Sequence, residues 1–266
     1  MIHPTAVIHP KAEIDPSTVI GPYAVVDAEV MIGAECQLGP HVYITGKTNI
    51  GCGNRFHAGC VIGDAPQDLK YASARTGLRI GDNNVFREHV TVHRANKVEE
   101  DTVVGSNNFL MASAHVGHNS RIGNNVIIAN GALLGGHVSV DDRAFISGTC
   151  LLHQFTRVGT LSLMRGGSGI SKDLPPYTIA TGENHICGLN VVGLRRAGFT
   201  DEQRLELKRL YRLLFRQRLR LKDALAQARE TFESSAARVM IDFVAASQRG
   251  VCSDLGAREE ELGTPN

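Results

Sequence analysis

Four histidines in the segment 115–153 are the residues of this sequence best suited to chemistry. His115 and His118 are three positions apart, and His137 and His153 follow after short stretches of aliphatic and small residues. A neutral imidazole accepts a proton near pH 7 and also binds zinc, so the group is suited to general-base catalysis or to a metal site. Which of these applies depends on how the chain places the four side chains in space.

A six-residue repeat predicts the elements that place them. Between Ile2 and Ile170, 27 of the 29 positions at six-residue steps carry a large apolar side chain, and only Asp68 and Ala74 do not. Many of these positions are followed by Gly or Asp, which we interpret as corners with unusual backbone angles. The fourth residue after each apolar position is often small or compact. The pattern is typical of a parallel β-helix, in which each strand stacks on the equivalent strand of the next coil.

The repeat also predicts which residues are neighbours. Three hexads form one triangular coil of about 18 residues, so we expect about ten coils. Residues one coil apart should be separated by one strand spacing, roughly 4.8 Å. His118 therefore stacks on Gly136, and His115, His137 and His153 lie on the same side of the prism.

Changes in the repeat divide the chain into regions. Residues 1–190 are predicted to form a mainly β domain with a loop excursion at residues 63–79, where both exceptions to the repeat lie. Residues 191–250 are predicted to form a small α-helical C-terminal domain. Residues 251–266 are predicted to be a flexible tail. The spacing of the repeat carries no information about the handedness of the β-helix.

Helical signals support the C-terminal domain. Thr200 followed by Gln203 fits a capping box, and leucines then recur at helical spacing. Further helices are predicted at about 219–231 and 235–248, the second of them ending before Gly250.

The charge of the chain is balanced overall but not locally. Its 28 Lys and Arg nearly cancel its 27 Asp and Glu, so the composition does not favour a nucleic acid or a membrane surface as partner. From Arg195 to Lys222, however, there are ten basic and three acidic residues. This segment is either a solvated helix face or a docking surface for an acidic partner.

Features of the sequence point to the cytoplasm. The N-terminus carries prolines and acidic residues where a secretory signal has a basic start and an apolar run, and no segment approaches 18 consecutive apolar residues, so no membrane span is expected. The six cysteines are scattered without a CxxC pair, which favours reduced thiols over disulfides or a thiolate metal site.

The residues alone leave two interpretations of the histidines open. His153 occupies a corner position, as His3 and His57 do, whereas His118 and His137 fit neither the corner nor the core column of the repeat. Three neutral imidazoles also suit zinc. Because no nearby carboxylate or thiolate completes a ligand set, we expect no metal.

Longer motifs make the sequence more specific. It resembles the UDP-N-acetylglucosamine O-acyltransferases, the first enzymes of lipid A biosynthesis, from near the N-terminus to about residue 250, in the segments APQDLKY (65–71), HVTVHR (89–94), NNFLMASAHVGHNSRIG (107–123), LLGGHVSVDD (133–142), LLHQF (151–155), SKDLPPY (171–177) and LNVVGLRRAGF (189–199). The resemblance implies a left-handed parallel β-helix and a homotrimer with active sites between subunits. It also implies transfer of a 3-hydroxyacyl chain from acyl carrier protein to the glucosamine 3-hydroxyl of UDP-N-acetylglucosamine, with no separate cofactor.

The resemblance assigns roles to individual residues. It makes His118 the general base and the backbone N–H of Gly136 the donor to the oxyanion. Residues that would position the sugar and acyl groups are Gln67, Asp68, Lys70, His93, His115, His137 and His153; Asn190 and Arg196 would hold the nucleotide, and Gly166 would leave room for a long acyl chain. The basic segment would then dock the acidic acyl carrier protein.

The sequence departs from the family pattern near these residues. Asn119 follows the base where the family often has an acid, and an amide orients an imidazole without stabilising its charge as a carboxylate does. Val192, Ala197 and Ala95 also differ from the usual residues. Alternatives that stay open are an acceptor with a 3-amino group, a coenzyme A donor, and a non-catalytic scaffold that binds a sugar nucleotide.

Overall fold

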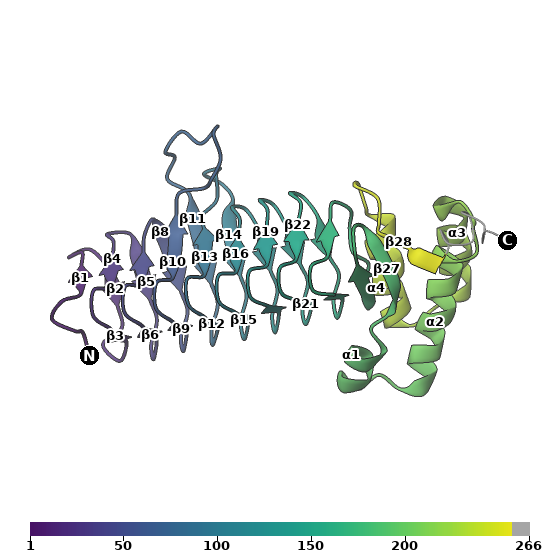
Figure 1. The fold of residues 1–266 in the computed structure, drawn as a ribbon, viewed down its shortest axis with the longest axis horizontal. Coiled ribbons are helices and arrows are strands. Elements are labelled where there is room, and N and C mark those ends of the chain that lie inside the picture. The colour runs from purple at the N-terminus through teal and green to yellow at the C-terminus, as the bar shows by residue number, and fades with distance from the viewer. Residues whose placement is uncertain (257–266) are drawn as a thin grey trace.

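The computed structural model describes residues 1–256 and shows a long prism that ends in a group of helices (Figure 1). Three sheets, numbered 1 to 3, form the prism, and their neighbouring strands are parallel except for one pair, β26 and β27. Sheet 1 consists of β1 (Val7–Ile8), β4 (Val25–Val26), β7 (Tyr43–Ile44), β10 (Val61–Asp64), β13 (Thr91–His93), β16 (His115–Val116), β19 (Leu133–Leu134), β22 (Leu151–Leu152) and β25 (Gly169–Ile170). Sheet 2 consists of β2 (Glu13–Ile14), β5 (Val30–Ile32), β8 (Lys47–Ile50), β11 (Gly77–Ile80), β14 (Asp101–Val104), β17 (Arg121–Ile122), β20 (Ser139–Val140) and β23 (Arg157–Val158). Sheet 3 consists of β3 (Val19–Ile20), β6 (Gln37–Leu38), β9 (Arg55–Phe56), β12 (Val85–Phe86), β15 (Phe109–Leu110), β18 (Ile127–Ile128), β21 (Phe145–Ile146), β24 (Leu163–Met164), β26 (Thr178–Thr181), β27 (His185–Leu189) and β28 (Ser253–Asp254).

The coils stack with the predicted spacing. Val116 pairs with Leu134, and Leu134 pairs with Leu152, so equivalent residues of these coils are 18 positions apart. Each coil runs from sheet 1 to sheet 2 to sheet 3. We name the three corners by the sheets that they join: the 1–2 edge, the 2–3 edge and the 3–1 edge.

The interior confirms the large and small columns of the repeat. The hexad residues point inward, and Ile44, Leu110 and Ile128 are 0% exposed. Cys60 and Cys150 from the small column are also 0% exposed, so these cysteines fill space in the narrow interior. Removal of each large aliphatic side chain from water contributes about 1.5–3 kcal/mol, which is why the sequence repeats it at every strand.

The corner glycines are needed for a different reason from the one predicted. Gly117, like most glycines directly after a hexad residue, does not have a positive φ. A Cβ on it would lie 2.7 Å from the backbone of Gly135 in the next coil. The prediction of unusual backbone angles at this column is therefore wrong, because the glycine allows two coils to approach closely. The left-handed conformation occurs two residues later, as at Asn119, with φ 58°.

A first loop leaves the prism between β10 and β11. Ile50 pairs with Ile80, so this coil holds two extra hexads. The loop comprises residues 65–76 rather than the predicted 63–79, because both ends of the predicted segment are paired as strands. It stands out above the prism in Figure 1.

A second, shorter loop was not predicted. Ile80 pairs with Val104, so one extra hexad lies in this coil, and residues 94–100 connect β13 to β14. Val98 was predicted to continue the repeat, but it is 66% exposed in this loop, which polar contacts to the next coil hold in place. The two loops take up three hexads, and sheet 1 has nine strands, close to the predicted number of about ten coils.

Residues 191–245 form four helices: α1 (Val191–Arg196), α2 (Asp201–Phe215), α3 (Leu221–Thr231) and α4 (Ser235–Ala245). Thr200 and Gln203 form the predicted capping box at the start of α2. Helix α1 was not predicted; it is short, and Asn190 caps its first turn. Leu207, Leu210 and Met240 form part of a second core among the helices.

The prediction of a flexible tail is wrong for residues 251–256. Strand β28 pairs with β27, and Cys252 is 0% exposed. The buried carboxylate of Asp254 accepts hydrogen bonds from Tyr211 and Arg216, which ties this segment to the helical domain. The rest of the predicted tail lies outside the described residues. In residues 1–256, no helix combines the length and apolar character that crossing a bilayer would need.

Candidate active site

Most of the predicted site residues lie on the 1–2 edge. The turns that carry His118, Gly136 and His153 follow β16, β19 and β22 of sheet 1 at this edge. Loops 65–76 and 94–100 leave the prism at the same edge, because each connects a strand of sheet 1 to a strand of sheet 2. The edge is therefore the one place where the regular coil meets both irregular segments.

His118 and Gly136 lie against each other on successive coils, as predicted. The backbone N–H of His137 donates to His118 O at 2.8 Å, which fixes the register of the two turns. A Cβ on Gly136 would lie 2.6 Å from His118 Nε2, so the imidazole occupies the space that the missing side chain leaves. Among the described residues, the Gly136 N–H has no hydrogen-bond partner, although its neighbours donate to adjacent coils.

Aromatic contacts join four of the histidines in two pairs. The rings of His118 and His137 meet edge to face at 5.2 Å, and His137 stacks on Phe155 at 4.5 Å. His93 and His115 form a second edge-to-face pair at 5.0 Å. Phe155 was missed by the sequence analysis, although its position 18 residues after His137 would have placed it there.

The surroundings of three histidines favour their neutral forms. Burial lowers the pKa of His115 to about 4, and the neighbouring His93 adds to this effect. Burial also lowers the pKa of His93 and of His137. These rings are therefore uncharged near neutral pH and available as hydrogen-bond partners of a substrate. The hydroxyl of Thr91 lies 2.7 Å from His115 Nδ1 and orients that ring.

The first loop brings its predicted residues to the same edge. Asp68 accepts a hydrogen bond from the backbone N–H of Lys70 and another, at 2.8 Å, from Asn96 of the second loop. The first of these bonds has the larger effect in lowering the pKa of Asp68, and the nearby His118 also favours the carboxylate. Gln67 and Lys70 are exposed beside it.

Asn119 occupies the centre of a polar network that the sequence did not reveal. Its Oδ1 lies 2.8 Å from His118 Nδ1, and its Nδ2 donates to Glu100 Oε2 at 2.7 Å. Asn119 is 7% exposed. Asn96 and Glu100 were missed because the apparent hexad at Val98 hid the loop that carries them.

Two predicted residues lie farther along the prism. His153 is exposed on the 1–2 edge, where Arg249 contacts its Nδ1 at 3.3 Å. Gly166 lies on the 3–1 edge, and a Cβ there would meet only Gly148 O, at 3.6 Å. The space beside Gly166 is therefore open in the single chain.

The structure does not bring the predicted nucleotide residues to the histidines within one chain. The Asn190 side chain donates to Leu161 O on the 2–3 edge and accepts from the Gly193 N–H, so it caps α1. Arg196 is exposed at the end of the same helix. The two sets of predicted substrate-binding residues thus lie on different edges of a single prism.

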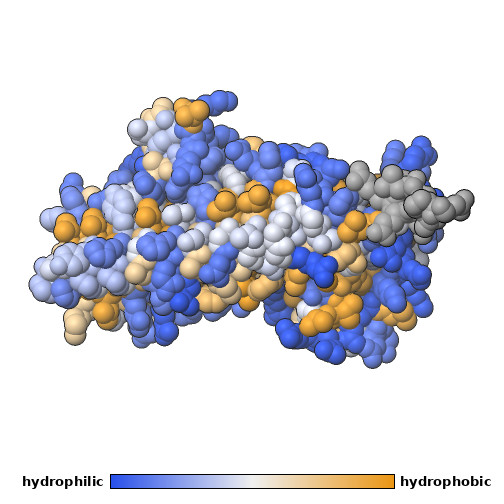
Figure 2. Space-filling model, viewed as in Figure 1, coloured by the Kyte–Doolittle hydropathy of each residue, from blue (hydrophilic) through white to orange (hydrophobic). Residues whose placement is uncertain are grey.

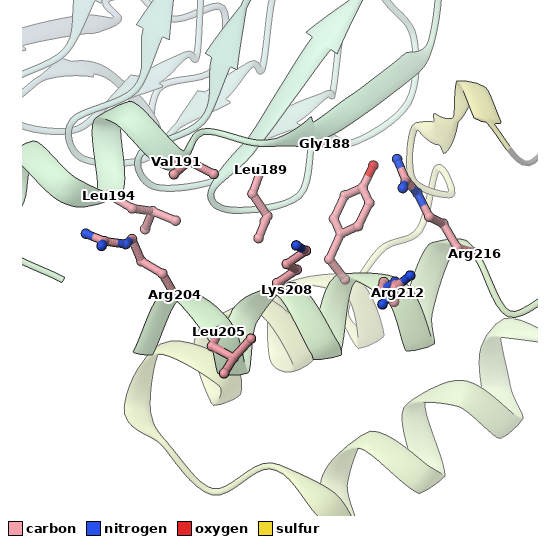
Figure 3. Close-up of a pocket in the computed structure, with 10 residues that line it drawn as sticks. Gly188, Leu189, Val191, Leu194, Arg204, Leu205, Lys208, Arg212 and Arg216 are labelled. Atoms are coloured by element: carbon pink, nitrogen blue, oxygen red, sulfur yellow. The ribbon is translucent and has the colours of Figure 1, made fainter. Parts of the chain in front are cut away.

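A pocket of about 570 Å³ lies between β27, α1 and α2 (Figure 3). Apolar residues such as Leu189 and Leu194 line one side, and basic residues line the other: Arg204, Lys208, Arg212 and Arg216. Arg204 and Arg216 pair with Asp201 and Asp254. Within residues 1–256, neither Lys208 nor Arg212 has an acidic partner, so the pocket offers a positive charge to a ligand.

The arrangement favours acid–base chemistry. In the part of the chain that the structure describes, no three His, Cys, Asp or Glu side chains converge as metal ligands do. What converges is an imidazole and a backbone N–H on successive coils, with neutral histidines and a carboxylate around them. Such a set can accept a proton from a hydroxyl group and stabilise an oxyanion.

The chain is similar to known proteins in sequence and in structure. The family model described as bacterial transferase hexapeptide (six repeats) matches residues 101–136, and the one described as UDP N-acetylglucosamine O-acyltransferase, domain 2, matches residues 173–252. The chain is 51% identical over 244 residues to the acyl-(acyl-carrier-protein)–UDP-N-acetylglucosamine O-acyltransferase of Gloeothece citriformis, covering 91% of this chain and 88% of that relative. The enzyme of the same name from Synechocystis sp. is 53% identical over 216 residues, 81% of this chain and 78% of that one.

A solved structure extends the similarity to the fold. The UDP-N-acetylglucosamine acyltransferase of Francisella novicida superposes with a TM-score of 0.94 at 37% identity, covering 97% of this chain and 96% of the other. The predicted left-handed parallel β-helix with a small helical domain at its C-terminal end is therefore confirmed. This chain is a member of the UDP-N-acetylglucosamine O-acyltransferase family.

Proposed function

We propose that this chain transfers a 3-hydroxyacyl group from acyl carrier protein to the 3-hydroxyl of the glucosamine in UDP-N-acetylglucosamine, the first step of lipid A biosynthesis. The observation that carries the proposal is the contact of His118 with Gly136 on successive coils of the 1–2 edge. The names of the relatives support the choice of donor and acceptor.

The geometry supports a direct transfer. His118 Nε2 removes the proton of the sugar hydroxyl while its oxygen attacks the thioester carbonyl. The new oxyanion accepts a hydrogen bond from the N–H of Gly136. When the tetrahedral intermediate collapses, the carbon–sulfur bond breaks and the imidazolium returns its proton to the leaving thiolate. No charge accumulates on the other histidines, which stay neutral and orient the substrate.

The remaining site residues have binding roles in this proposal. Residues on the 1–2 edge hold the sugar and the start of the acyl chain: Gln67, Asp68, Lys70, His93, His115, His137 and His153. Asn190 and Arg196 hold the nucleotide; an arginine makes charge-assisted, fork-shaped hydrogen bonds to a diphosphate. Gly166 leaves room at the 3–1 edge for a long acyl chain.

We propose that the active protein is a homotrimer with sites between neighbouring prisms. In one prism, the histidines and Asn190 lie on different edges. A second copy is therefore needed to place a nucleotide-binding Asn190 near the histidines that act on the sugar. Leu133 and Leu151 on the outer face of sheet 1 are 46% and 55% exposed. Figure 2 shows apolar patches along the length of the prism. Such a surface suits burial between copies.

The pocket beside α2 is the proposed docking surface for the donor. Lys208 and Arg212 offer positive charge to an acidic carrier protein, and charge complementarity speeds such encounters. The proposed location is the cytoplasm, because all six cysteines are free, as in a reducing compartment.

Acyl transfer to UDP-N-acetylglucosamine by the natural protein and by His118→Ala tests the function. We expect turnover by the first and a loss of at least about 100-fold by the second, since a positioned general base contributes that much. Near-normal turnover by the variant would reject the base, and an inactive natural protein would reject the acceptor or the activity. Parallel assays with a 3-amino sugar nucleotide, with coenzyme A thioesters and with short and long acyl chains decide the acceptor, donor and chain length.

A further inference from the structure

Glu100 reaches the general base through one side chain. Its Oε2 accepts a hydrogen bond from Asn119 Nδ2 at 2.7 Å, and Asn119 Oδ1 lies 2.8 Å from His118 Nδ1. We infer that Glu100 is a positioning residue for His118, acting through the amide of Asn119 in a three-residue relay. The inference rests on the proposed role of His118 as the base and adds a residue to which no role has been assigned.

The partners of Asn119 determine the direction of every hydrogen bond. The backbone N–H of Asn96 can only donate, and it lies 3.0 Å from Asn119 Oδ1. The carboxylate of Glu100 only accepts, so the group facing it must be the amide nitrogen. The oxygen of the same amide therefore faces His118, whose Nδ1 must carry a proton. Nε2 is then the unprotonated nitrogen, and it is the one beside Gly136.

The relay is held rigidly from several sides. The backbone N–H of Asn119 donates to Thr102 Oγ1 at 2.7 Å, and His118 O accepts from His137 N. Both His118 and Asn119 are 7% exposed. A rotation of the amide would break its contacts with Asn96 and Glu100 of the second loop and with His118. The relay therefore fixes both the tautomer and the direction of the imidazole before a substrate arrives.

The charge of Glu100 has a role beyond geometry. Partial burial acts to raise the pKa of Glu100, but hydrogen bonds from Lys97 and Asn119 outweigh it, and the pKa lies below its ordinary value. A carboxylate on one side of an amide polarises it and strengthens the hydrogen bond on the other side. When His118 takes up the substrate proton, that bond stabilises the positive ring. The amide passes no proton onward, so both protons stay on the imidazolium.

Glu100→Gln tests the contribution of the negative charge separately from that of the hydrogen bond. The new amide oxygen can still accept from Asn119, so the loop keeps its hydrogen bond while the negative charge is lost. We expect kcat to fall by about tenfold, the effect of one weakened charge-assisted bond in the transition state, with KM and melting temperature nearly unchanged. Glu99→Gln, the same change at the exposed neighbouring residue, is the matched control and should keep full activity. An unchanged kcat in Glu100→Gln would overturn the relay.

Exchange of the two groups provides a rescue test. Asn119→Asp alone places two carboxylates against each other and should lower kcat and stability. Asn119→Asp combined with Glu100→Gln lets the new amide at position 100 donate to the new carboxylate at position 119. The His118 Nδ1–H keeps its acceptor, so we expect the double variant to regain most of the natural kcat. A double variant as slow as the worse single variant contradicts the inference.

A measurement that needs no turnover separates this inference from the proposed function. In protein labelled with nitrogen-15 in histidine, the signal absent from His118→Gln identifies His118. We expect it to show the tautomer with the proton on Nδ1, and Glu100→Ala to shift it toward a mixture. If the natural protein transfers no acyl group, the proposed function fails while this spectrum still decides the relay. A proton on Nε2, or no change in Glu100→Ala, would overturn it.

Discussion

Gly136 shows how closely the site depends on a single missing side chain. A Cβ there would lie 2.6 Å from His118 Nε2, so the ring would have to shift and its contact with Asn119 would be strained. We expect Gly136→Ala to lower kcat by about 100-fold, at the lower end of what a positioned base contributes. Steady-state kinetics of Gly136→Ala and of the natural protein check the prediction, with their melting temperatures as the control for folding, and equal activities would show that the ring tolerates displacement.

The buried His115 predicts how stability depends on pH. Its pKa is about 4 in the folded chain against an ordinary value of 6.5, so between these values the unfolded chain binds more protons. The stability that neutral His115 provides is complete above pH 6.5 and is lost as the pH falls toward 4. Melting temperatures across this range should therefore fall less steeply for His115→Gln than for the natural protein. His9→Gln, a change at an exposed position, should retain the natural slope.

At the scale of elements, one buried carboxylate joins the prism to the helices. Asp173 is 1% exposed; it accepts two hydrogen bonds from the guanidinium of Arg157 in β23, and a third from Ser247 just beyond α4. The same guanidinium donates to Phe243 O in α4. The last coil and the helical domain are thus linked through an ion pair whose carboxylate is buried and whose guanidinium is 31% exposed.

We expect Asp173→Ala to lower the free energy of unfolding by about 3 kcal/mol, because it leaves Arg157 without its counter-charge. Urea unfolding measures the difference. Asp223→Ala removes the partner of Arg220 in an exposed pair and should cost no more than about 1 kcal/mol. Similar losses in the two variants would mean that the junction does not depend on the buried pair.

The two loops differ in whether they interrupt the six-residue repeat, which is why one was predicted and the other was not. Asp68 and Ala74 break the apolar column, so the first loop is visible in the sequence. Val98 keeps the column intact, although it is exposed, because the second loop contains one complete hexad. A loop that adds six residues and keeps an apolar residue at the repeat position leaves the periodic pattern unchanged, so the sequence does not reveal it. Asn96 and Glu100 could be assigned to the site only after the loop was seen.

At the scale of the whole molecule, the exposed apolar face of sheet 1 predicts assembly. Leu151 is 55% exposed in the single chain, which suits a residue covered by a neighbouring copy. We expect Leu151→Glu to convert a trimer to monomers and to abolish acyl transfer, because a charge between copies would be buried without a partner. Val239→Glu, at a residue 43% exposed on α4, is the control. Light scattering after size-exclusion chromatography measures the mass of the assembly. An unchanged mass for Leu151→Glu would show that the contacts between subunits lie elsewhere.

The repeating part of this protein can be predicted from the amino-acid pattern alone. Each strand carries one large and one small inward side chain, so the register of 18 residues and the stacking of His118 on Gly136 follow from local pattern alone. The contacts that do not repeat from coil to coil become visible only in the folded chain. The corner glycines serve the approach of the next coil, and Asn119 meets Glu100 because a loop folds back over the edge. A periodic pattern predicts contacts that recur in every coil, whereas a contact made once depends on a chain path that only the folded molecule defines.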